Sequence, residues 1–282
     1  MTEASLIQEL PEAQATGELA AIYAEVRRYT GVPYVSSLQR QLATLPGALP
    51  WAWGSIRAAM ISGLLPTTAW GSVAELPLPP LAPIPRPALR LFGVEAADEA
   101  SLVAICASFR RASPVNLLLG ACLRRLLAGE DTGGGTAAEE PWTPPAPTPP
   151  LPAMLDRAAL SDEASATLAC FRRGEGGQAF IPGNYRMFAC WPGFLAHLAV
   201  VLPALLAAPE TARVLHGLAE AMDRIAPDIL AALPAELPPL PPPEVRETIL
   251  AALAKYHTTS PEMVVVHHLL AKALPDGKES TS

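Results

Sequence analysis

The chain has 282 residues, of which 50% are hydrophobic and 17% are charged, so it has enough apolar material for one large core or two smaller ones. Its formal net charge is −7, and its arginine pairs are scattered. It therefore lacks the basic face with which nucleic-acid-binding proteins contact phosphates. An acidic chain is also poorly suited to an anionic membrane surface. Ala and Leu dominate the composition, and because both favour helices we expect an all-α fold.

The N-terminal residues include Glu3 and Glu9 and show no basic start followed by an apolar run. We therefore expect no signal peptide and a cytoplasmic protein. The cysteines are far apart and form no C-x-x-C pair, so neither a redox pair nor a structural zinc site is expected. We predict buried free thiols instead. The four cysteines are Cys106, Cys122, Cys170 and Cys190.

The first half of the chain contains four recognisable segments. Residues 18–28 form an amphipathic stretch that ends in two arginines, and an apolar stretch follows at residues 42–56. A Pro-rich connector occupies residues 77–87. Ser113-Pro114 then precedes an apolar run. Because Ser is a common N-cap and Pro a common first helical residue, we expect a helix to begin there.

These features recur in the same order in the second half. Residues 163–173 again end in two arginines, and residues 234–243 are again Pro-rich. Pro192 follows Pro46 by 146 residues, and Pro261 follows Pro114 by 147. Such constant spacing predicts two tandem related helical repeats that form a pseudo-dimer.

The predicted boundaries are residues 1–128 for the first repeat, 129–154 for a Gly/Pro-rich linker and 155–282 for the second repeat. The linker holds too many prolines for a helix or a central strand, so an extended spacer is expected. It would serve as a crossover between the repeats or as a polyproline ligand for a partner.

An uncharged run of 23 residues at 187–209 is long enough to span a bilayer. Pro192, Gly193 and Pro203 interrupt it. A helix that is apolar on all sides can also lie at the centre of a large helical protein. We therefore expect a buried helix and no membrane association.

Several short segments carry a family resemblance. They are Tyr23–Arg27, Val32–Val35, Leu42–Gly47, Ser113-Pro114, Trp191-Pro192 and Tyr256. In these segments the chain resembles the group I 2-haloacid dehalogenases, which act on both D- and L-2-haloacids. The resemblance implies an all-helical pseudo-dimer with its active site between the halves and with no metal or organic cofactor. In that family an aspartate activates a water, which displaces halide from a small 2-halocarboxylic acid with inversion of configuration.

The resemblance also implies site residues. The catalytic aspartate of the family falls on Asn184, and an amide cannot take a proton at neutral pH. Tyr34 stands where the family has a pocket tryptophan, Ser113 where it has an asparagine, and Tyr256 is retained. These three are the predicted substrate-binding residues.

Asn184 and His257 are the candidate catalytic residues, because imidazole titrates near neutrality and could supply the missing base. Glu262 follows Pro261, and in the first turn of a helix its charge would be favoured. Adjacent His267 and His268 point about 100° apart on a helix and have no carboxylate at ligand spacing, so no metal site is expected.

Three functions remain open from the sequence. The first is a 2-haloacid dehalogenase that hydrolyses small halocarboxylic acids by direct water attack, with activity limited by Asn184. The second is a non-catalytic helical protein that binds a small carboxylic acid or a protein partner. The third is a different hydrolase that uses His257. The sequence also leaves a homodimer open.

Overall fold

The structure is a computed structural model that describes residues 8–135, 142–155, 159–174 and 180–275. Within these ranges it is built from helices, and its β-type pairing is limited to one isolated bridge between Arg173 and Phe180. The all-α prediction is therefore confirmed. The α-helices are α1 (Gly17–Thr30), α2 (Ser37–Leu42), α3 (Ala48–Ile61), α4 (Leu64–Gly71), α5 (Arg86–Leu91), α6 (Glu99–Leu127), α7 (Asp162–Ala169), α8 (Gly183–Phe188), α9 (Pro192–Ala207), α10 (Pro209–Ala231) and α11 (Pro243–Ala273), with short 3₁₀ turns at Glu12–Gln14 and Ala96–Asp98.

Local sequence explains several helix positions. In α1 the buried Ile22, Val26 and Tyr29 recur every three or four residues, which places them on one face. This helix ends at Gly31, whose φ of 64° is the left-handed conformation that favours glycine. At the start of α7 the Ser161 hydroxyl accepts a hydrogen bond from the backbone N–H of Ala164 at 3.2 Å, as an N-cap residue does.

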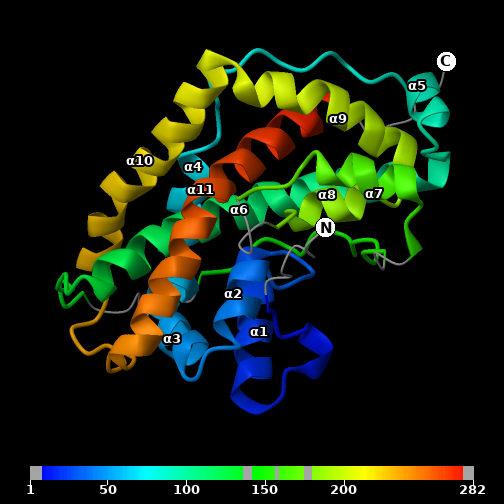
Figure 1. The fold of residues 1–282 in the computed structure, drawn as a ribbon. Coiled ribbons are helices and arrows are strands. Elements are labelled where there is room, and N and C mark those ends of the chain that lie inside the picture. The colour runs from blue at the N-terminus through cyan, green and yellow to red at the C-terminus, as the bar shows by residue number, and fades with distance from the viewer. Residues whose placement is uncertain (1–7, 136–141, 156–158, 175–179, 276–282) are drawn as a thin grey trace.

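The two long helices α6 and α11 pack against each other through the middle of the molecule (Figure 1). Ser113-Pro114 lies inside α6 and Ser260-Pro261 inside α11, so our expectation that helices begin at these pairs is wrong. An interior proline removes one helical hydrogen bond and crowds the preceding turn. The carbonyl of Arg111, in that turn of α6, accepts a hydrogen bond from Trp70 Nε1 at 2.9 Å. Both prolines are buried where α6 and α11 pack, so tertiary contacts outweigh the local start signal.

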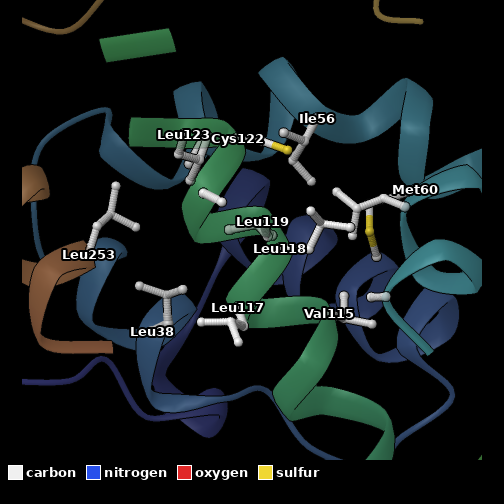
Figure 2. Close-up of a cluster of buried hydrophobic side chains, with 14 of the residues drawn as sticks. Leu38, Ile56, Met60, Val115, Leu117, Leu118, Leu119, Cys122, Leu123 and Leu253 are labelled. Carbon is white, nitrogen blue, oxygen red and sulfur yellow. The ribbon is translucent and has the colours of Figure 1, made fainter. Parts of the chain in front are cut away.

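Two hydrophobic cores flank the long helices. The first core joins α1–α4 and α10 to residues 115–127 of α6. In Figure 2, Ile56 and Met60 of α3 approach α6 on one side, and Leu253 of α11 approaches on the other. The second core joins α5 and α7–α9 to residues 102–106 of α6. Beyond residue 262, α11 contributes to both cores. Each core therefore contains helices from both halves of the sequence.

The helix order of the two halves can be set beside the predicted repeat. Within the described residues, five α-helices, α1–α5, precede the long α6, and four, α7–α10, precede the long α11. The Pro-rich residues 77–87 follow α4 in the first half, and the Pro-rich residues 234–243 follow α10 and lead into α11 in the second half. In the described part of the second half, no short helix corresponds to α5. The superposition of the two halves about a pseudo-twofold axis stays a prediction.

The described linker residues 142–154 contain no helix and lie against both halves. The backbone N–H of Thr148 donates to the Gly31 carbonyl at 3.0 Å, and the Thr148 hydroxyl bonds to Ser108 of α6. Cys190 Sγ donates to the Ala153 carbonyl at 3.5 Å. The path of these residues is that of a crossover between the two halves.

Among the described residues, one helix, Ala96–Leu127, is long and apolar enough to span a membrane, and 72% of its most apolar window is buried inside the protein. Helices α9 and α10 meet the same test only together, across a bend of 76°. Burial raises the pKa of Cys106 and of Cys122 on α6 to about 12. Cys170 is exposed and Cys190 is half-buried, so the expectation of buried thiols is wrong for these two.

Candidate functional site

A cavity of about 700 Å³ lies where α2, α6, α8 and α11 meet. Two of these helices come from each half, and linker residues 150–154 complete the wall. The polar and aromatic side chains that line it are Glu9, Tyr34, Ser36, Ser37, Arg40, Phe109, Ser113, Asn116, Phe180, Arg186, Tyr256, Thr259 and Ser260.

The structure brings the three predicted substrate-binding residues together, because Tyr34, Ser113 and Tyr256 all line this cavity. The two predicted catalytic residues are not among its lining residues. His257 points to α10, where its Nε2 lies 3.3 Å from Asp223 Oδ2. Asn184 is fully buried on α8, although Gly183 and Met187 of the same helix line the cavity.

The Asn184 amide is unusual because neither its oxygen nor its nitrogen has a hydrogen-bond partner within the described part of the chain. Leaving a buried polar group unpaired costs about 1–3 kcal/mol. The neighbouring Tyr185 hydroxyl donates to Glu262 Oε1 at 2.6 Å. Burial and the charge of Glu262 raise the pKa of Tyr185 well above its usual value.

Glu262 lies in the middle of α11 and not in the first turn of a helix, so that sequence expectation is wrong. Both of its oxygens are engaged by Arg173, whose Nε and Nη2 each lie 2.6 Å from them. Burial disfavours the charge of Arg173, but the hydrogen bonds and charge of Glu262 outweigh it and raise the pKa of Arg173. This buried network ties α8 and α11 to the segment after α7 and leaves Glu262 poorly placed as a base.

Two hydrogen-bond donors beside the cavity, on Arg40 and Tyr256, have no acceptor among the described residues. Arg40 Nη2 lies 2.6 Å from Glu9 Oε2 and donates to Ser37 Oγ at 3.4 Å, whereas its buried Nε–H has no partner among the described residues. The buried hydroxyl of Tyr256 also lacks one. Burial is the main cause that raises the pKa of Tyr256, with Glu9 adding to the rise and Ser37 and Arg40 opposing it. These side chains therefore form one polar cluster.

Helix α2 is fixed to α6 next to this cluster. Gln39 Nε2 donates to Asn116 Oδ1 at 2.8 Å, and Asn116 Nδ2 donates to Ser36 Oγ at 2.9 Å. Sequence reasoning did not identify Arg40, Glu9 or Asn116 as site residues. Asn116 lies within the apolar run that was predicted as a helix, and a polar residue in such a run was an available signal.

A stack of rings supports the aromatic side of the cavity. Phe109 lies between Tyr34, at a centroid distance of 5.6 Å, and His267, at 4.5 Å. Burial lowers the pKa of His267 to about 4, so this histidine is neutral at pH 7. Its Nδ1 donates to the Met263 carbonyl at 2.8 Å. Among the residues that the structure describes, no group of three or more His, Cys, Asp or Glu side chains is placed to hold a metal ion.

A comparison of sequences finds a curated relative, a configuration-inverting 2-haloacid dehalogenase of Alcaligenes xylosoxydans xylosoxydans. The two chains are 27% identical over 175 residues, which is 60% of this chain and 59% of the relative. The match thus spans little more than half the length of that relative. No family model matches the chain.

Solved structures extend the likeness to the whole chain. A D-2-haloacid dehalogenase mutant in complex with D-2-CPA superposes with a TM-score of 0.72 at 20% identity, over 96% of this chain and 97% of the other. The chain has the fold of the D-2-haloacid dehalogenases. A second structure, a D-2-haloacid dehalogenase with L-LA, gives a TM-score of 0.71 at 20% identity over the same shares of both chains. The resemblance stated from short motifs is therefore supported by a sequence match and by the fold.

Within this dehalogenase fold, the charged groups among the described residues that line the cavity are few. Arg40 and Arg186 line it, and Glu9 is the one carboxylate among the described lining residues. No described lining residue is a histidine. The described lining residues therefore provide few groups that could accept a proton.

Proposed function

We propose that this protein binds organic carboxylates of the 2-haloacid type in the cavity between its halves and releases halide from them slowly at most. The observation that carries the proposal is the pair of unpartnered buried donors, Arg40 Nε and the Tyr256 hydroxyl, at one end of the cavity. In this proposal a ligand carboxylate accepts a hydrogen bond from each, and both side chains must rotate to expose these buried atoms to the cavity. Charge-assisted hydrogen bonds of this kind are about twice as strong as neutral ones.

Slow chemistry follows from the lack of a base. Water displaces halide efficiently only if a group takes its proton during the attack, and such help is worth about 10²–10⁴ in rate. Asn184 cannot take a proton, His257 faces Asp223, and Glu262 is held by Arg173. Glu9 is the remaining carboxylate among the described lining residues, and one of its oxygens already contacts Arg40 at 2.6 Å.

The binding test is calorimetric titration with each enantiomer of 2-chloropropionate. We expect Arg40→Gln to weaken binding by at least tenfold, because it removes the charged donor. Val200→Ala is the matched control, since Val200 is 78% exposed on α9 and is not a lining residue of the cavity. Equal affinity of the natural protein and the Arg40→Gln variant would contradict the proposed headgroup site.

The catalytic test is ion chromatography of halide after incubation with the same acids. We expect little release from the natural protein and even less from a Glu9→Gln variant if Glu9 supplies the residual activity. Rapid release by the natural protein, unaffected by Glu9→Gln, would show that another base operates.

A further inference from the structure

The cavity is too large for a three-carbon acid alone. Its volume of about 700 Å³ lies within the range of roughly 300–1,000 Å³ that is typical of sites for drug-sized ligands. At about 30 Å³ for each water molecule in the liquid, the cavity corresponds to roughly 23 water volumes. A 2-halopropionate, with six non-hydrogen atoms, displaces only a few of them. Most of the cavity thus remains for another part of a ligand.

The walls of the cavity differ in polarity from one side to the other. The α2 side carries Ser37 and Arg40, close to Tyr256, which packs against the first core. Another part of the lining is formed by apolar side chains that belong to, or pack against, the second core: Leu151, Met154, Leu168, Ile181, Met187 and Met263. Three of these are methionines, whose unbranched and polarizable side chains adapt to ligands of irregular shape. Arg186, which also lines the cavity, is engaged in an interaction of its own.

We infer that the preferred ligand is a carboxylic acid with a long alkyl or aryl substituent, bound with its carboxylate at Arg40 and Tyr256 and its substituent against the apolar wall of the second core. This inference rests on the proposed function, because it places the carboxylate at the same donors. It goes further in that the apolar substituent, and not the 2-halogen, supplies most of the affinity.

The test compares propionate, octanoate and 4-phenylbutyrate by calorimetric titration below their micelle concentrations, with 1-octanol as a ligand without a carboxylate. Each buried CH₂ strengthens binding by a factor of about 4. Octanoate has five more CH₂ groups than propionate, so we expect it to bind roughly 10²- to 10³-fold more tightly, at one molecule per chain. We expect 1-octanol to bind more weakly than octanoate by at least tenfold.

Two tryptophan variants separate a ligand in the cavity from non-specific adsorption. Ile181 is partly buried at the cavity wall, so Ile181→Trp fills part of the apolar side without overpacking the core. We expect this variant to lose at least tenfold in octanoate affinity while propionate affinity stays within twofold. Val200→Trp adds the same side chain at an exposed position of α9, and it should change neither the octanoate affinity nor the propionate affinity.

The outcomes distinguish this inference from the proposed function. Propionate binding that equals octanoate binding would overturn the long-substituent ligand and leave the carboxylate site in place. Failure of all three acids to bind would overturn both. Equal loss of octanoate affinity in the two tryptophan variants, or equal binding of 1-octanol, would assign the binding to non-specific adsorption and overturn the inference.

Discussion

Replacing Asn184 with aspartate puts a carboxylate at the position where the dehalogenase resemblance places the base. The change is nearly isosteric, but the environment is demanding, because the side chain is fully buried and its amide has no hydrogen-bond partner among the described residues. A carboxylate there loses its hydration, and burial can raise an aspartate pKa by as much as 3–5 units from about 3.9. The nearby charge of Glu262 acts in the same direction.

The size of this pKa shift sets the expected loss of stability. A folded-state pKa raised by about two units corresponds to about 2.7 kcal/mol of destabilisation of the ionised form. Because the folded-state pKa lies above the unfolded-state value, the variant should match the natural protein below about pH 4. It should lose stability as the pH rises to the folded-state pKa, near pH 6, and stay constant above it. If water reaches the new carboxylate, halide release should rise by about 10²–10⁴ and increase with pH over the same interval.

The assays are urea denaturation at pH 4 and pH 8 and ion chromatography of halide released from each enantiomer of 2-chloropropionate. Asn184→Leu is the matched control, since it has a similar shape and cannot take a proton. It should be more stable than the natural protein by about 1–2 kcal/mol, because it removes an unpaired buried amide. Equal halide release from the aspartate and leucine variants would refute the reasoning about position 184.

Three further predictions concern groups that the structure removes from the chemistry or gives a structural role. Glu262→Gln should lower the free energy of unfolding by about 2–3 kcal/mol in urea titrations, because the amide loses the negative charge and one of the two oxygens that accept from Arg173. Unchanged stability would mean that the network is not formed in solution. His257→Ala should cost at most about 1 kcal/mol, as a partly exposed pair with Asp223 does, and leave halide release unaltered; a loss of activity would restore His257 as a catalytic residue. Folded His267 has a pKa of about 4 against 6.5 when unfolded, so about 3 kcal/mol of stability should be lost as the pH falls from 6.5 to 4. His267→Phe, measured over the same pH range, should abolish that part of the acid dependence.

The all-α fold was predictable from sequence because the apolar residues recur at helical spacing in segments such as α1 and α10. The positions of Pro114 and Pro261 inside helices could not be predicted from sequence. Ser-Pro is a common signal for the start of a helix, and only long-range packing shows that the helix continues through it. The two turns of helix before each pair contain few large apolar residues, so their periodicity is weak.

The site was predictable only in part. Tyr34, Ser113 and Tyr256 could be assigned to one place because short motifs near them resemble those of a known family. Asn184 was assigned in the same way, but whether its side chain points into the cavity depends on the rotation of the short helix α8, and this rotation is set by contacts that local sequence does not encode. Arg40 and Glu9 could not be paired, because nothing in the sequence shows that the N-terminal segment returns to α2.

The shared helices α6 and α11 have a consequence for how the protein folds. Residues 102–106 of α6 belong to one core and residues 115–127 to the other, so neither core is complete until both halves of the chain are present. A fragment that ends before the linker would therefore expose the apolar face of half of α6 and would need the remaining fragment to cover it. The intact protein should unfold in a single cooperative transition. Ligand bound at the crossing of these helices would stabilise the whole molecule and not one half of it.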